Sequence, residues 1–569
     1  MFQNNRLICP IEKFFYMKGN SKMINLFHEG HSGINNVKKY LFVASLAVIM
    51  HSVLVCGAVR PDDYYTEPQV YGDRPNPAGE YDLGPIGASG IMTRIYKGVV
   101  VTVEETQPNT PAHGKFNKGD IIVGVNGELL KGKNPLVVLG MAVTKAEATD
   151  GVLAFDIKPG KDSAVKKVTI KIPVLGAYSK TFPLNCAKSK KIIKQAAQFY
   201  SGKDRLKSHD LHNALACLFL LSTGDDAYVP RVKEYFHQFL NADGSVKGIG
   251  DHSWYNGYNG VACAEYYLRT GDKSVLPILQ HYCDDARDRQ AYGIGWGHWG
   301  YGVWPAYEAG GGMMHAAGNQ ILLTLVLGKM CGVDVDEKTL VGALKHWYRF
   351  VGHGAIPIAD QRYWHIFRSA GRDGATAAVM QIASCAKGDA SIYKQAHEYL
   401  SMSALTSWPE RQYNFEVIWH SISGANVLEY DPDLYYKTQQ RFIWNFNLRR
   451  QASGAFYAHS DHPSMNPTDA GVSLALAHTA PLKNLAIQGA PRSKYARDFT
   501  LPAHLWGTEA DRAFLSAKHN KDFYKYGKED EMHILFRQLP IRLQYSPGDV
   551  KGLSLNMMLR NVRHWRCAV

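Results

Sequence analysis

Several patterns that mark well-defined classes of protein are missing from this chain of 569 residues. It contains no Gly-x-Ser-x-Gly elbow and no P-loop, which disfavours esterase and nucleoside triphosphatase functions. It also has no Lys/Arg run interleaved with aromatic residues, so we exclude nucleic acid as a partner despite a formal net charge of +13. The basic excess suits acidic polymers such as uronate or sulfated glycans, and an ordinary solvated surface is the alternative.

Cysteine is sparse and follows no recognisable spacing. The chain has nine cysteines, of which Cys9 and Cys56 lie in the N-terminal region considered next. The remaining seven include no C-x-x-C pair, and their odd number argues against a disulfide framework and against a Cys-rich zinc site. Cys217, Cys263 and Cys385 lie in Ala-rich stretches typical of helices, so we interpret them as small buried hydrophobic residues.

The N-terminal region carries an apolar run that is too short for a stable membrane span. The run Leu41–Val55 has 15 residues and contains His51, which disfavours permanent residence in hydrocarbon. The basic pair Lys38–Lys39 precedes it, and small residues ending at Ala58 follow it, as is typical of a secretory signal. We therefore predict an exported protein that is periplasmic, secreted or at the cell surface, with residues 1–58 as the signal region.

Two details of the signal region stay open. Translation from Met23 would shorten the long segment before the apolar run, and lipidation at Cys56 is an alternative that the bulky Val55 disfavours. Residues 1–58 hold six Lys/Arg and two Asp/Glu, so removing them lowers the formal charge from +13 to +9.

A polar linker and a β-rich domain are expected next. Residues 59–82 contain four prolines among Asp, Tyr and Gly, which predicts an extended linker. Residues 83–178 then alternate between short apolar runs and turn signals such as Asn126-Gly127, with one helix expected over Asn134–Lys145. The runs that predict strands are Ile91–Ile95, Val99–Val103, Ile121–Val125, Val152–Ile157 and Val168–Ile172.

This β-rich domain resembles a bacterial PDZ domain. The resemblance is carried by Thr110-Pro111-Ala112, then Lys118-Gly119-Asp120-Ile121-Ile122, then Val125-Asn126-Gly127, in that order. It implies a module that captures peptides by adding a strand to a sheet edge. The nearest candidate for the peptide-carboxylate loop comprises Leu83, Gly84, Ile86 and Gly87, although the intervening Pro85 removes one amide donor. A PDZ fold that only packs against its neighbour is an equal alternative.

From residue 189 onward the apolar period changes from two to about 3.6, which predicts helices. Alternate segments are small and apolar nearly all round, whereas those between them are amphipathic, so the first kind is expected inside and the second outside. The expected segments are 189–201, 208–222, 226–241, 257–270, 273–288, 311–331, 336–351, 372–387, 390–404, 412–429, 432–449 and 468–480.

Repeated Gly-Asp pairs separate the helical hairpins. Gly224-Asp225, Gly271-Asp272 and Gly388-Asp389 each close an apolar helix and start an amphipathic one, because Gly ends helices and Asp caps them. Val333-Asp334 and Tyr430-Asp431 are expected at equivalent joints without the Gly. Six hairpins predict a multidomain protein in which the small β-rich PDZ-like domain precedes an all-α (α/α)6 toroid over residues 189–480. A helical solenoid is the alternative.

The order of these two domains resembles an uncharacterised family of exported bacterial proteins. The toroid is similar to six-hairpin glycosidases and to terpenoid cyclase and prenyltransferase barrels. The likeness spans roughly residues 60–480 and implies no assigned chemistry, while residues 481–569 form an extension of unknown fold.

Polar and aromatic residues gather in the loops that precede the expected inner helices. Aromatic rings bind sugars through their apolar faces, and carboxyl groups in the same loops could transfer protons. The residues predicted to bind substrate are His252, Trp254, Tyr255, Trp296, Trp299, Trp304, Arg372 and Arg411. The residues predicted to be catalytic are Glu308, His315, Asp373, Glu416 and Asp461.

Two metal-like patterns are weaker signals. Asp284-Asp285-Ala286-Arg287-Asp288 copies the spacing of a terpene synthase magnesium motif, but it falls on an expected outer helix whose acids should face solvent. The loop sequence His459-Ser460-Asp461-His462 lacks the fixed helical register of a metal site. We therefore predict no metal and no cofactor.

The leading hypothesis is an exported carbohydrate-active enzyme, either a glycoside hydrolase or a polysaccharide lyase, whose PDZ-like module binds a peptide. In a hydrolase, two of Glu308, Asp373, Glu416 and Asp461 would form a pair across the funnel on which the inner helices of the toroid converge. A lyase would use an Arg or Asn on the uronate and a His or Tyr on the proton. The alternatives are a non-catalytic scaffold protein and, less favoured, a terpenoid-cyclase-like enzyme.

Overall fold

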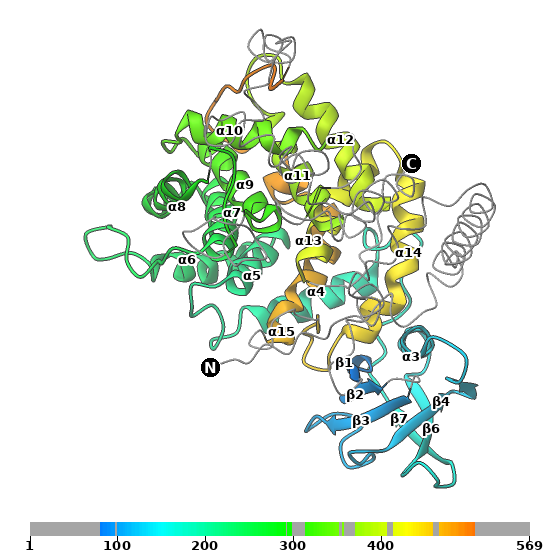
Figure 1. Cartoon of the computed structure of the whole chain (residues 1–569). Coiled ribbons are helices and arrows are strands. Elements are labelled where there is room, and N and C mark those ends of the chain that lie inside the picture. The colour runs from blue at the N-terminus through cyan, green and yellow to red at the C-terminus, as the bar shows by residue number, and fades with distance from the viewer. Residues whose placement is uncertain are drawn as a thin grey trace, which may run out of the picture. The chain divides into compact units, whose positions relative to one another are not determined.

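The computed structural model describes two domains of different architecture (Figure 1). The residues described are 80–96, 100–291, 293–298, 313–351, 356–357, 370–406, 414–458 and 466–506. All of them belong to one of the two units of the chain, Glu67–Val569. The predicted signal region lies outside the described residues.

The first domain is an antiparallel sheet with the strand order β1-β2-β3-β4-β6-β7, in which β5 pairs with β4. All five predicted strands are present, and the expected helix is α3. Two strands are additions: β1, which begins in the predicted linker, and the two-residue β5. The elements are β1 (Glu80–Pro85), β2 (Ile91–Tyr96), β3 (Val100–Thr106), β4 (Ile121–Val125), β5 (Glu128–Leu129), α3 (Pro135–Ala148), β6 (Val152–Lys158) and β7 (Lys166–Lys171).

Local sequence explains these elements. Along β6, Leu153, Phe155 and Ile157 are buried while their neighbours are not, as expected for a strand with one face on a core. Asn126 and Gly127 both have positive φ, of 52° and 81°, and form the two-residue turn between β4 and β5.

The second domain is all-helical, and each of the twelve predicted helical segments contains helix. Short 3-10 turns precede several helices, for example at Asp226–Tyr228 and Lys273–Val275. The helices are α4 (Ala187–Tyr200), α5 (Leu211–Ser222), α6 (Val229–His237), α7 (Ser253–Thr270), α8 (Leu276–Arg289), α9 (His315–Cys331), α10 (Glu337–Tyr348), α11 (Ala370–Ala383), α12 (Ser391–Thr406), α13 (Asn414–Gly424), α14 (Pro432–Arg449), α15 (Pro467–Ala470) and α16 (Val472–Thr479).

Six of these helices form a closed inner ring. In the order α5, α7, α9, α11, α13 and α16, each contacts the next, and α16 contacts α5. A solenoid would leave its first and last helices apart, so the contact between α16 and α5 favours the toroidal arrangement. Helices α6, α8 and α12 each contact two consecutive inner helices from outside.

The joints between hairpins follow the predicted chemistry with one correction. Gly224, Gly271 and Gly388 have φ between 73° and 92°, and the aspartate after each accepts a backbone N–H two residues on. At the joint between α9 and α10, the prediction that Val333-Asp334 takes the place of a Gly-Asp pair is wrong. Gly332, with φ 83°, ends α9, and Asp336 caps α10 by accepting from Thr339 N.

Residues Lys483–Trp506, which we call the C-terminal strap, cross the C-terminal ends of the three inner helices α5, α7 and α9. Asn484 donates to the carbonyl of Ser222 at the end of α5, and Ser493 donates to that of Leu268 on α7. The backbone N–H of Arg497 donates to the carbonyl of Met330 on α9. The strap therefore satisfies carbonyl groups that helix ends leave without an intrahelical partner.

A buried charged cluster joins the two domains. The Lys188 ammonium lies 2.7 Å from a Glu147 carboxylate oxygen, with both side chains fully buried, and Arg450 pairs with the same carboxylate. Trp444 and Leu448 of α14 belong to the hydrophobic core of the sheet domain. Helix α14 is therefore shared between both cores.

The described cysteines are free thiols. Cys186, Cys217, Cys263, Cys283 and Cys331 are buried. The interpretation of Cys385 as a buried residue is wrong, since it follows the end of α11 and is exposed. In the part of the chain that the structure describes, none of the helices combines the length and the apolar character of a membrane span.

Candidate functional site

Histidines gather where the inner helices begin. His209 precedes α5, His252 caps α7, His298 precedes α9 and His315 opens it. Helices of the inner ring start at the same end because each hairpin returns the chain to that end. This end of the ring therefore holds most of the predicted site residues that the structure describes.

The first group at this end is the histidine–aromatic cluster, which comprises His209, His252, Trp254, Tyr255 and His298. Nδ1 of His252 accepts the backbone N–H of Tyr255 at 3.3 Å, so the imidazole caps α7. The two rings stack with centroids 3.8 Å apart and an interplanar angle of 14°. Both side chains are half-buried, which leaves part of this stack accessible.

Three further rings complete the cluster. Trp254 meets His298 edge to face at a centroid distance of 6.1 Å, and His209 meets Tyr255 at 6.4 Å. Nε2 of His209 lies 2.9 Å from the hydroxyl of Tyr282, which is buried and holds the imidazole in place.

The imidazoles of the cluster are uncharged at neutral pH. Burial lowers the pKa of His209, His252 and His298 to about 4 in each case. The positive charge of Arg289 adds to the effect on His252. Repulsion from a protonated His252 adds to the effect on His298. Burial also raises the pKa of Tyr255, so its phenol keeps its proton. The cluster therefore offers neutral imidazoles as proton acceptors and a phenol as a proton donor.

Below the cluster, aromatic side chains fill the middle of the ring. Trp254 stacks on Tyr258 with centroids 6.5 Å apart, and Tyr258 stacks on Trp419 of α13 at 6.1 Å. The indole N–H of Trp419 donates to the Tyr258 hydroxyl at 3.1 Å. Tyr258 and Trp419 are almost completely buried, so they form a floor on which Trp254 rests.

A buried ion pair supports the start of α7. The Arg289 guanidinium donates to both carboxylate oxygens of Asp285, and it donates to Ser253 Oγ at 2.8 Å. Asn256 also donates to Asp285 at 2.8 Å. The expectation that the acids of the Asp284–Asp288 motif face solvent is therefore wrong for Asp285, whose partner four residues later compensates its burial.

Three predicted site residues converge instead on a short stretch of backbone. Nδ1 of His315 lies 2.8 Å from the carbonyl oxygen of Pro357, and Nε of Arg372 donates to the carbonyl of Ile356 at 2.6 Å. The Asp373 carboxylate accepts the Ile356 N–H at 3.0 Å, and its other oxygen accepts from Ser403 at 2.8 Å. We call these three side chains the backbone clamp.

The remaining predicted residues fall into two classes. Trp296 is fully buried, and its indole N–H donates to the carbonyl of Ala286 at 2.7 Å, so it is packed inside the domain. The others lie outside the described residues or, for Glu416, have a side chain that does. These are Trp299, Trp304, Glu308, Arg411, Glu416 and Asp461.

The candidate peptide loop is packed against the helical domain. Gly84 pairs with Thr93 in the sheet, as Leu83 does with Arg94, and Ile86 is buried. An added Cβ at Gly87 would lie 2.6 Å from Val143 of α3 and 3.0 Å from the carbonyl oxygen of Asn447 of α14. Peptide binding at this loop stays a prediction.

Sequence reasoning missed three residues that contact other members of the site or hold them in place. His209, Tyr282 and His346 act through tertiary contacts with residues on other helices. The only sequence signal is the position of His209 directly before Asp210, the N-cap of α5. Among the described residues, no group of three or more His, Cys, Asp or Glu side chains has the arrangement of a metal site.

Comparison with known proteins adds a family match. A family model described as "Domain of unknown function (DUF6288)" matches residues 189–489. Neither the curated proteins nor the solved structures gave a match.

Proposed function

The chain belongs to the DUF6288 family, and from this premise we propose that its helical domain is a polysaccharide lyase that cleaves uronate-containing glycans. The observation that carries the proposal is the histidine–aromatic cluster at the start of α7. It combines an accessible aromatic surface with imidazoles that are uncharged at neutral pH.

The aromatic members of the cluster suit a sugar substrate. Tyr255 and His252 are half-buried and stacked, and Trp254 lies beside them on the aromatic floor. Flat rings held by neighbouring rings bind the apolar faces of sugars without losing much side-chain freedom. The formal net charge, which is +9 without the predicted signal region, favours an acidic polymer over a neutral one.

Two side chains of the cluster have roles in proton transfer, His298 as the base and Tyr255 as the acid. The neutral His298 imidazole takes the proton from C5 of the uronate, and the electron pair of that C–H bond forms the C4–C5 double bond. The C4–O bond breaks, and the leaving oxygen takes the proton of the Tyr255 phenol. Proton exchange with water then restores both side chains, and no oxidant or reductant is needed.

Glycoside hydrolysis has less support in the described residues. It needs two carboxyl groups about 5–10 Å apart across the bond that breaks. Of the four carboxylates predicted for this role, only Asp373 has a described side chain, and both of its oxygens accept hydrogen bonds from the chain.

The test is to incubate the purified chain with uronic, sulfated and neutral glycans and to follow the ultraviolet absorbance of the unsaturated uronate product. Tyr255→Phe removes the phenol and keeps the stacked ring, so product formation should fall by about a hundredfold or more. His298→Gln should have a similar effect. His252→Asn keeps a helix cap, because Asn is a good N-cap, but it removes the ring stacked on Tyr255. It should therefore weaken substrate binding and lower product formation less than the other two variants do.

Tyr267→Phe is the matched control, because Tyr267 lies on the same helix far from the cluster and next to Tyr495 of the strap. Binding of a glycan without product would support the non-catalytic alternative. Release of saturated reducing ends without absorbance would support hydrolysis and overturn the lyase assignment.

We also propose that the protein is exported. Support comes from the segment Lys38–Ala58, with its basic pair, apolar run and small residues. A mature chain isolated from the native host should begin near Val59. Residues before Leu41 on the folded protein would overturn the proposal.

A further inference from the structure

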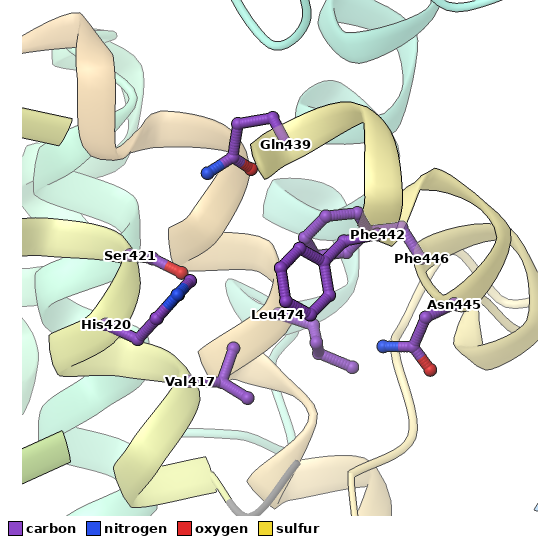
Figure 2. A pocket seen from close by; sticks show the side chains of 8 residues that line it. All are labelled: Val417, His420, Ser421, Gln439, Phe442, Asn445, Phe446 and Leu474. Atoms are coloured by element: carbon purple, nitrogen blue, oxygen red, sulfur yellow. The ribbon is translucent and has the colours of Figure 1, made fainter. Parts of the chain in front are cut away.

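A buried cavity lies in the wall of the ring, between α13, α14 and α16. It is separate from the histidine–aromatic cluster, which belongs to α5, α7 and the segment before α9. Figure 2 shows His420 on one side of the cavity and Asn445 on the other, with Phe442 between them. All eight lining residues are at most 6% exposed. They are Val417, His420, Ser421, Gln439, Phe442, Asn445, Phe446 and Leu474.

Two buried acceptor atoms of the lining have no hydrogen-bond partner within the described part of the chain. They are Nε2 of His420 and Oδ1 of Asn445, in residues that are 3% and 2% exposed. The other ring nitrogen of His420 donates to the carbonyl of Leu405, so Nε2 carries a lone pair. Because burial lowers the pKa of His420 to about 4, Nε2 stays unprotonated at neutral pH. Two acceptors cannot bond to each other, so each needs a donor from a third group.

Size and charge restrict that group to a small, neutral molecule. The space open to the centre of a water-sized group is about 20 Å³, and about 10–15 Å³ by this measure is enough for one water molecule. None of the eight lining residues is Asp, Glu, Lys or Arg, so a cation would lose its hydration here without gaining a counter-charge. Because the whole lining is almost completely buried, a group carried on a larger ligand is excluded as well.

We propose that this cavity binds a water molecule that donates one hydrogen bond to Nε2 of His420 and the other to Oδ1 of Asn445. Water has two O–H donors, which matches the two acceptors. The Ser421 hydroxyl and the Gln439 amide also line the cavity, and both are groups that can donate to a water oxygen. Buried waters typically make about three hydrogen bonds to polar groups that would otherwise be unsatisfied, and they form part of the folded structure.

The water molecule bridges two helices that carry different parts of the protein. His420 follows Trp419, which forms part of the aromatic floor on which Trp254 rests. Asn445 follows Trp444, which belongs to the hydrophobic core of the sheet domain. The bridge therefore joins α13 of the inner ring to α14, the helix shared by both cores. It does not depend on the proposed lyase activity.

A crystal structure of the full chain at neutral pH, at a resolution that shows ordered water, tests the site directly. Electron density for a water oxygen should lie about 2.7–3.2 Å from both Nε2 of His420 and Oδ1 of Asn445. Absence of such density, or a direct hydrogen bond between the two side chains, would overturn the proposal.

A double-mutant cycle tests the bridge in solution. His420→Leu and Asn445→Leu each remove one acceptor, so each should raise the equilibrium constant of unfolding in urea about fivefold or more. The second replacement removes the acceptor that the first one leaves without a donor. The effect of the double variant should therefore be smaller than the product of the two single effects, by about threefold or more.

His420→Leu combined with Lys437→Ala, at an exposed position of α14, is the matched control, and its effects should multiply without such a difference. Independent effects of His420→Leu and Asn445→Leu would show that no water links the two side chains and would overturn the proposal. Should either variant fail to fold, the crystal structure of the unmodified chain decides between the two outcomes.

Discussion

His315 of α9 and His346 of α10 are joined by a hydrogen bond between their Nε2 atoms, which lie 2.8 Å apart. Since Nδ1 of His315 donates to the carbonyl of Pro357, its Nε2 must accept, and His346 must carry the proton on Nε2. The bond therefore links α10 to the backbone clamp and orients the imidazole of His315.

Replacing His346 should destabilise the fold around the backbone clamp. His346→Leu would leave Nε2 of His315 buried without a donor, at a cost of about 1–3 kcal/mol in the free energy of unfolding. Thermal or denaturant unfolding followed by circular dichroism measures the loss. His504→Leu, at an exposed position, is the control, and an equal effect of both variants would contradict the role assigned to the histidine pair.

Stability should depend on pH through Glu265, whose carboxylate contacts the strap. This fully buried carboxylate of α7 accepts the backbone N–H groups of Ala486 and Ile487 at 2.9 and 2.8 Å. Burial raises its pKa from 4.5 to about 7, although the two hydrogen bonds oppose the rise. The folded chain thus binds this proton more tightly than the unfolded chain. The contribution of Glu265 to stability should therefore decrease as pH rises from about 4.5 to 7.

Glu265→Gln removes that titration. The difference in melting temperature between the variant and the unmodified chain should therefore change between pH 5 and pH 8, in favour of the variant at the higher pH. A difference that is constant over this range would show that Glu265 does not titrate there.

Removing one member of the buried charged cluster between the two domains should lower the free energy of unfolding. Lys188→Met leaves Glu147 with Arg450 alone and removes a fully buried partner at 2.7 Å. Breaking one side of a buried ion pair costs about 3–5 kcal/mol, so the unfolding transition should move to a markedly lower denaturant concentration. Lys190→Met, at an exposed position of the same helix, should have little effect. A small effect of Lys188→Met would mean that Arg450 alone compensates Glu147.

The close approach of the strap to the second joint can be tested at Gly271. Its φ is 73°, and an added Cβ would lie 2.3 Å from Cε1 of Tyr495. Gly271→Ala should cost about 1–2 kcal/mol from backbone strain, and more if Tyr495 is displaced. Hydrogen exchange should become faster in residues 493–497 before it changes elsewhere. Uniform acceleration across the ring would contradict a local effect.

The sequence predicted the helices well because their signals are local. The contrast between an all-apolar helix such as α9 and an amphipathic one such as α6 reflects burial along a single segment. Gly followed by Asp marks a joint for equally local reasons, since one residue ends a helix and the next caps another.

The contacts of the candidate site depend on residues far apart in the chain. Asp285 is buried because Arg289 and Asn256 surround it, which a pattern of acids on an amphipathic helix does not reveal. The partners of His315 lie 31 and 42 residues away, on α10 and at Pro357. The strap has no periodic pattern, because single side chains such as those of Asn484 and Ser493, and the backbone N–H of Arg497, make its contacts with the helix ends.

The path of the strap also sets an order for biosynthesis. The first joint, at Gly224, receives Asn484 only after a further 260 residues have been made, and the contact at Lys387 requires Phe499. A nascent chain that has emerged through α13 therefore has neither the helix that closes its ring nor the residues that cover its helix ends. Its inner helices lack some of their packing partners until synthesis passes the strap, and incompletely folded chains with exposed apolar surface are prone to aggregate.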